Sequence, residues 1–213
     1  MADRFPDYDV LAKRDSPSWN SQTREVIDER LALTLHDDVL PPSALATLVA
    51  LVDHVVPQPA ARPPVNTAAI LLDRIANDSG DGFRREGMPR FAEAWRRGLV
   101  AIGDEADLRY GRPFPALDAG EARALLVAVE RGTTASPRWG GLPPALFWSW
   151  RLLPDIVSAY YAHPSAWSAI GFGGPAAPRG YVRLQADRRD PWEAAETGDG
   201  ALLPARLRNR HAR

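Results

Sequence analysis

Cysteine is absent from this chain of 213 residues, and its absence excludes several kinds of chemistry at once. Disulfide bonds, thiolate nucleophiles, iron–sulfur clusters and cysteine-containing zinc sites all need a thiol. Thiols therefore give no indication of the redox state of the protein's compartment.

The sequence also lacks an excess of charge of either sign. Its 26 Lys and Arg residues against 27 Asp and Glu residues give a formal net charge of -1. A nucleic-acid binder is expected to be clearly basic, so we predict no nucleic-acid partner. The longest apolar stretch, residues 43–56, is interrupted and falls short of the roughly 20 residues that span a bilayer, so we predict no membrane span.

The N-terminus lacks the features of an export signal. Residues 1–9 contain acidic residues and a proline, where a signal peptide has basic residues followed by an apolar segment. The nearest basic pair, Lys13-Arg14, has no apolar segment behind it. We therefore expect that this chain carries no export signal.

Alternating strand patterns are nearly absent, and apolar residues instead recur every three to four positions between capping residues and prolines. This spacing predicts helices over residues 20–35, 43–56, 66–75, 89–111, 118–132, 145–161 and 164–171. The fold class is therefore all-α, a compact helical domain of about six to seven helices with an irregular C-terminal segment.

Composition suggests three parts of the chain. We predict an N-terminal arm over residues 1–19, a helical domain over residues 20–184 and an extended or disordered tail over residues 185–213. Within the helical domain, Pro154 cannot donate a backbone hydrogen bond and should kink or split the helix over residues 145–161. Residues 180–184 are the only plausible extended run.

Catalytic groups are scarce. No Gly-x-Ser-x-Gly motif occurs, and no two of the four histidines stand at the i, i+4 spacing that places two imidazoles on one metal ion. His36, Asp37, Asp38, Asp53 and His54 could converge on a metal, but helix capping and edge packing also explain the two histidines. We therefore predict no catalytic, cofactor-binding or metal-binding residue in this chain.

Two other patterns have simple explanations. Residues 171–175 have the glycine density of a phosphate-binding loop, yet no lysine follows and no strand precedes them. The basic pairs Arg84-Arg85 and Arg96-Arg97 are interpreted as solvated surface.

Aromatic residues concentrate in one stretch of the chain. Nine of the 18 lie between residues 139 and 181, namely Trp139, Phe147, Trp148, Trp150, Tyr160, Tyr161, Trp167, Phe172 and Tyr181. Such residues can form a second layer of core when their polar tips find partners. They are also the preferred anchors of protein–protein interfaces. The two interpretations can share residues.

The end of this stretch resembles a known family. Residues 160–164 (Tyr-Tyr-Ala-His-Pro), 167–175 (Trp-Ser-Ala-Ile-Gly-Phe-Gly-Gly-Pro) and 178–181 (Pro-Arg-Gly-Tyr) are similar to motifs of the gluconate 2-dehydrogenase subunit 3 family. Residues 48–57 and 110–118 resemble the same family in the same order. The resemblance extends from Leu45 to Tyr181.

This resemblance implies a partner. Subunits of this family accompany a large flavoprotein of the glucose–methanol–choline (GMC) oxidoreductase type, which binds FAD and oxidises a sugar, sugar acid or polyol. The small subunit holds no cofactor and stabilises the large one. Many members also carry a twin-arginine export signal. Because residues before the first predicted helix hold no arginine pair, we expect a cytoplasmic complex, and an extracytoplasmic one only if the partner carries the signal.

The predicted partner interface follows from the aromatic and glycine-rich segment. It comprises Tyr160, Tyr161, His163, Trp167, Ile170, Gly171, Phe172, Gly173, Gly174, Pro175, Arg179 and Tyr181. Two alternatives remain open. One is a free-standing helical metalloenzyme using His36, Asp37, Asp38 and His54, and the other is a helical adaptor unrelated to redox chemistry.

Overall fold

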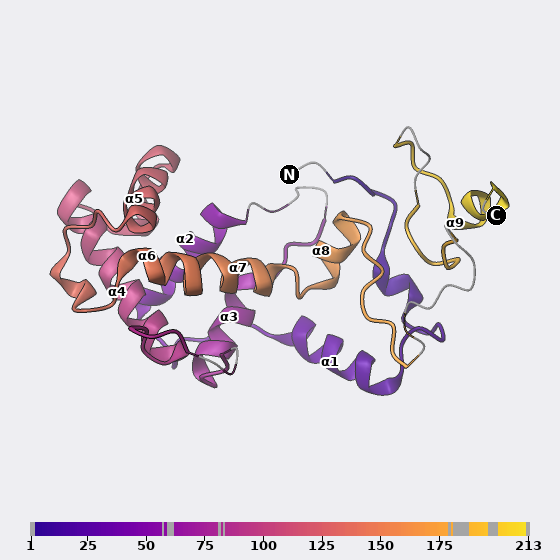
Figure 1. The fold of residues 1–213 in the computed structure, drawn as a ribbon, viewed down its shortest axis with the longest axis horizontal. Helices are drawn as coiled ribbons and strands as arrows, with labels where there is room; N and C mark the ends of the chain where they lie inside the picture. Colours follow the sequence, from indigo (N-terminus) through magenta and orange to yellow (C-terminus); the bar gives the residue numbers. More distant parts are fainter. Residues whose placement is uncertain are drawn as a thin grey trace. The chain divides into compact units, whose positions relative to one another are not determined.

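Helices and the loops between them make up the described part of the chain (Figure 1). The structure is a computed structural model that describes residues 3–56, 58, 62–80, 82, 84–178, 180, 188–195 and 200–211. The α-helices are α1 Ser21–Ala32, α2 Pro42–Val55, α3 Thr67–Ala76, α4 Phe91–Tyr110, α5 Ala119–Arg131, α6 Pro144–Phe147, α7 Leu153–Tyr160, α8 Pro164–Ala169 and α9 Ala205–Arg208. Short 3-10 turns are η1 Val10–Lys13, η2 Phe114–Ala116, η3 Pro137–Trp139 and η5 Asn209–His211, and η4 Trp148–Leu152 is a π-helical turn.

The all-α prediction is confirmed. Among the described residues no strand forms, and Trp19 and Ala177 form an isolated parallel bridge. Six described helices have seven or more residues, in agreement with the predicted number. The extended run predicted over residues 180–184 lies, apart from Gly180, outside the described residues.

Helix termini follow local chemistry. Asp118 and Glu121 form the predicted capping box of α5, in which each side chain accepts a hydrogen bond from the other residue's backbone N–H. Helix α4 begins at Phe91, two residues after Pro89, and its Ala92 N–H donates to the distant carboxylate of Asp78 at 2.8 Å. A residue of the preceding loop thus satisfies a free N–H of the first turn of α4.

The first helix ends earlier than predicted. Helix α1 stops at Ala32, so the prediction that it continues through Leu35 is wrong. The carbonyl of Leu33, which a continuing helix would use internally, accepts a hydrogen bond from the Asn66 side chain at 2.8 Å. Of the predicted apolar stripe only Ile27 is buried, and Val26, Leu31 and Leu35 are exposed.

The predicted split near Pro154 is confirmed. The π-helical turn η4 separates α6 from α7, and the N–H of Leu153 donates to the carbonyl of Trp148, five residues back. Because Pro154 has no N–H to donate, it fits the first turn of α7, where no internal partner is needed. The chain therefore forms two short α-helices in place of one long one.

Contacts divide the chain into two units. Unit 1 comprises residues 1–32, 58–65 and 161–213, and unit 2 comprises residues 33–57 and 66–160. The predicted boundary after residue 19 falls inside unit 1. The predicted boundary after residue 184 lies outside the described residues.

Unit 2 is a helical bundle with an aromatic centre. Within it α2 packs against α4, α3 against α7, and α5 against α6. The rings of Trp95 and Phe147 meet edge to face at 5.5 Å, and both are fully buried. The Trp95 indole N–H donates to the buried carboxylate of Asp155 at 2.8 Å, so this tryptophan has a polar partner inside the core.

Candidate partner-binding site

Helix α8 begins the segment that the sequence singles out, and local chemistry sets its ends. His163 has an extended backbone (φ −101°, ψ 140°), as expected before proline, and its Nδ1 accepts the N–H of Ser165 at 3.1 Å. Pro164 then occupies the first helical position. Gly171 follows the helix with φ +70°, which confirms the predicted left-handed termination.

Trp167 is a core residue of unit 1. Its side chain is 5% exposed and packs in a cluster with Val10, Trp19 and Ile27. The indole N–H donates to the carbonyl of Tyr161 at 2.5 Å. The interpretation of this tryptophan as core therefore holds, and little of its side chain remains to contact a partner.

The glycines of the segment let the backbone pass close to aromatic rings. A β-carbon at Gly174 would lie 2.9 Å from Cε3 of Trp167, and one at Gly171 would lie 2.5 Å from Cε2 of Phe5. Both residues have positive φ, so both geometry and space favour glycine here. Glycine density in this loop thus has a packing role.

Polar bonds fix the same loop to the N-terminal part of unit 1. The carbonyl of Pro175 accepts the indole N–H of Trp19 at 2.8 Å and the Nζ of Lys13 at 3.1 Å. The hydroxyl of Ser168 accepts the N–H of Val10 at 3.0 Å. These bonds connect the loop to the N-terminal part of unit 1 within the chain itself.

A few apolar side chains of the segment remain open to solvent. Ile170 is 45% exposed and Phe172 is 46% exposed, although the Phe172 ring touches Trp167 edge to face at 6.1 Å. A shallow groove of about 300 Å³ lies between α1 and the loop, and its lining includes Val26, Trp167 and Pro175. These exposed groups form the part of the segment that can contact another protein.

The structure separates the twelve predicted interface residues by burial. Tyr160, His163, Trp167, Gly173 and Gly174 are buried, Tyr161, Gly171 and Pro175 are half-buried, and Ile170 and Phe172 are exposed. Tyr160 belongs to unit 2, and the other nine belong to unit 1. Arg179 and Tyr181 lie outside the described residues.

His163 is held in its neutral form. Burial, aided by the positive charge of Arg30, lowers the pKa of His163 from 6.5 to about 4. Its Nδ1 lone pair is also used by the Ser165 N–H. This histidine is therefore a helix cap that is uncharged near neutral pH.

The residues proposed for a metal site do not assemble one. The imidazole of His36, which lies four residues after the end of α1, is hydrogen-bonded to Asp38. The ring of His54 packs edge to face on Phe114, with 5.8 Å between the ring centres. The described residues contain no group of three or more His, Asp or Glu side chains placed to hold a metal ion. Within the same residues, no helix has the length and apolar character to cross a bilayer.

Sequence patterns did not identify the residues of the same chain that pack against this segment. Phe5, Val10 and Trp19 come from the predicted N-terminal arm, yet they pack against Gly171 and Trp167. Isolated apolar residues in a stretch rich in turn-forming residues do not predict burial by themselves. Here their burial depends on residues about 150 positions away.

Comparison with known proteins locates this geometry within a family. The sequence model of gluconate 2-dehydrogenase subunit 3 matches residues 42–174, which is well over half of the chain. The chain belongs to the gluconate 2-dehydrogenase subunit 3 family. The predicted resemblance is thereby confirmed, and the family is one of accessory subunits of dehydrogenase complexes. No curated protein and no solved structure matches the chain.

The family match covers only the first part of the aromatic and glycine-rich segment. It includes α8 and the loop through Gly174, and it ends before Pro175, Arg179 and Tyr181. The residues that pack under the segment, Phe5 to Ile27, precede the match.

Proposed function

We propose that this chain is the non-catalytic accessory subunit that binds and stabilises a large FAD-dependent oxidoreductase of the GMC type. Membership of the gluconate 2-dehydrogenase subunit 3 family is the observation that carries the proposal. The partner would hold FAD and oxidise a sugar, sugar acid, polyol or glycoside, and this chain would hold no cofactor.

The proposed docking surface is the exposed loop that follows α8 and carries Ile170 and Phe172. Ile170 and Phe172 present apolar area to solvent on a loop that hydrogen bonds already hold in place. A preorganised loop loses little conformational freedom on binding, which favours association. Phenylalanine and large aliphatic side chains of this kind commonly fill pockets of a partner.

Co-expression with a GMC-type flavoprotein of the same genome, followed by size-exclusion chromatography, tests the proposal. The two proteins should elute together with flavin absorbance, and the small chain alone should be colourless. If two stable proteins elute separately and the flavoprotein is fully active alone, the proposal is wrong.

Substitutions separate docking from folding. The double variant Ile170→Ser and Phe172→Ser should weaken association by about ten-fold or more while the free chain stays folded. Leu108→Ser is the matched control, because Leu108 is an apolar residue of α4 with 59% exposure. Trp167→Ala should instead lower the stability of unit 1, since this side chain is core.

A further inference from the structure

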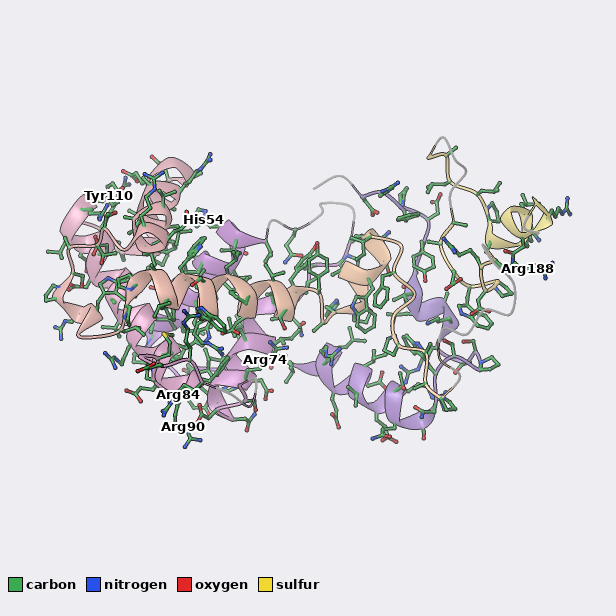
Figure 2. The ribbon with its side chains drawn as sticks, in the orientation of Figure 1. His54, Arg74, Arg84, Arg90, Tyr110 and Arg188 are labelled. Carbon is green, nitrogen blue, oxygen red and sulfur yellow. The ribbon has the colours of Figure 1, made fainter. Side chains whose placement is uncertain are left out.

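A second surface, which lies on unit 2, has the properties of a binding site. The connection between α3 and α4 and the π-helical turn η4 enclose an open pocket of about 470 Å³. Arginine contributes four of its described lining residues, Arg84, Arg85, Arg90 and Arg151, and Figure 2 labels two of them, Arg84 and Arg90. The sequence analysis interpreted the Arg84-Arg85 pair as solvated surface and did not predict that both line one pocket with Arg90 and Arg151.

Two acidic residues near the pocket, Asp78 and Asp155, already have structural roles, and the exposed Glu86 follows Arg85 in the sequence. Asp78 is the only acidic residue among the described lining, and it accepts the N–H of Ala92 and the Nε of Arg90 at 2.8 and 2.7 Å. These bonds, the backbone one first, lower the pKa of Asp78 and keep it ionised. Behind the lining, Asp155 lies 3.7 Å from Arg151.

Neither Arg84 nor Arg85 has such a counter-ion among the residues that the structure describes. Both are exposed, and in the described part of the chain no carboxylate pairs with either of them. The guanidinium of Arg85 lies 4.7 Å from the ring centre of Trp150, a stacked arrangement that orients its N–H groups. These two guanidinium groups are therefore open to solvent, where an acidic ligand can pair with them.

The chemistry of the lining selects carboxylates. A guanidinium presents paired N–H donors that match the two oxygens of a carboxylate. Trp150, Met88 and Phe91 supply apolar surface beside these donors, which suits the methylene groups of an acidic side chain. Arginine, tryptophan and methionine are also enriched at protein interfaces.

We propose that this arginine pocket binds an acidic, carboxylate-bearing segment of a partner protein. Charge complementarity and the open rim favour a protein segment over a small free acid. The side chain of Arg90 is 75% exposed, whereas a small-molecule site usually encloses most of its ligand. Charges on an open rim also steer a protein partner during encounter.

The assignment of the segment to the catalytic subunit rests on the proposed function, but binding of acidic residues by this pocket does not. The test therefore uses the full chain alone. The probe is a fluorescein-labelled hexapeptide of alternating Asp and Glu, followed by fluorescence anisotropy, with a peptide of alternating Asn and Gln as the neutral comparison.

The wild-type chain should bind the acidic peptide and not the neutral one, with affinity that falls as salt rises. The double variant Arg84→Ala and Arg85→Ala should bind at least ten-fold more weakly. Arg123→Ala, which removes an exposed arginine of α5, should bind like the wild type. Double substitution by Lys should restore part of the affinity, because it returns the charge without the planar fork.

The proposal is overturned if the acidic peptide does not bind, or if the alanine double variant binds it as well as the wild type. Competition with citrate distinguishes the sources of carboxylate. Tight binding of citrate with no binding of the peptide would mark a site for small acids and also overturn the proposal. A chain that binds the peptide but no flavoprotein would sustain this inference and remove the proposed function alone.

Discussion

Gly174 lies directly against the indole of Trp167, and a β-carbon on it would come within 2.9 Å of ring atom Cε3. Real β-carbons essentially never approach that closely, and the ring cannot move away because it is packed among core residues. Gly174→Ala should therefore lower the stability of unit 1 by about 2–4 kcal/mol, from overpacking and left-handed backbone strain together. Urea unfolding followed by tryptophan fluorescence measures the loss.

Gly111 provides the matched control for this substitution. Its φ of +67° is nearly identical to the +66° of Gly174, but nothing lies within 4 Å of its would-be β-carbon. Gly111→Ala should cost only the backbone strain, about 1–2 kcal/mol. If the two variants lose the same unfolding free energy, the contact with Trp167 does not contribute to the cost of Gly174→Ala.

His163 gives unit 1 a pH-dependent stability. Its pKa is about 4 in the folded chain and about 6.5 in the unfolded chain, so the unfolded state takes up a proton first as pH falls. The stabilisation is complete above pH 6.5, is lost progressively between pH 6.5 and 4, and changes no further below pH 4. Solvent screening reduces the full value of about 3 kcal/mol to about 2 kcal/mol.

His163→Asn isolates this contribution. Asparagine can still accept the Ser165 N–H as a helix cap, but it does not titrate in this range. The difference in unfolding free energy between wild type and variant should shift by about 2 kcal/mol between pH 7.5 and 4.5. A difference that stays constant over this interval would mean that His163 titrates normally in the folded chain.

Glu105 anchors the turn that follows α5 from inside unit 2. Its fully buried carboxylate accepts the backbone N–H groups of Ala135 and Ser136 at 2.8–3.0 Å and the Nε of Arg109 at 2.5 Å. Glu105→Gln replaces one acceptor oxygen by an N–H₂ group that faces donors, which should cost about 2–4 kcal/mol. Hydrogen exchange at the amides of Ala135 and Ser136 should accelerate accordingly.

The partly exposed Glu121 serves as the comparison for Glu105. It also bonds a backbone N–H, that of Asp118, and an arginine, Arg112. Because water can replace these bonds, Glu121→Gln should cost about 1 kcal/mol or less. If Glu105→Gln is equally mild, the buried anchor is not essential to the turn.

Local patterns predicted the helices well because their causes are local. The capping box at Asp118 and the split near Pro154 depend on residues within one or two turns. The end of α1 at Ala32 was missed because it involves a bond from Asn66, which no local pattern records. Long-range partners, more than propensity, decide such ends.

The same distinction explains what could be predicted of the site. The aromatic and glycine-rich segment was visible in the sequence, but its division into core and surface was not. Trp167 is buried because Val10 and Trp19 cover it, whereas Phe172, five residues further, stays half open. Likewise the arginine pocket needs η4 beside the α3–α4 connection, a proximity that spacing along the chain does not reveal.

Arg62 holds the N-terminal residues of unit 1 in place. Its guanidinium bonds both oxygens of Asp3, at 2.5 and 3.2 Å, and also donates to the carbonyls of Phe5 and Tyr8. The side-chain bond with Arg62 lowers the pKa of Asp3, and Phe5 in turn covers Gly171. Arg62→Gln should therefore expose the first residues to proteolysis and lower the stability of unit 1 by about 2–3 kcal/mol.

Arg14 offers a comparison with a similar pair at the surface of the same unit. It forms two bonds to Asp28 at 2.5 and 2.6 Å, but both side chains are well exposed. Arg14→Gln should leave the unfolding free energy nearly unchanged, because water replaces the pair. Limited proteolysis and urea unfolding of the two variants distinguish the cases. Equal behaviour would show that Arg62 contributes only a surface ion pair, and that Phe5 stays on Gly171 without it.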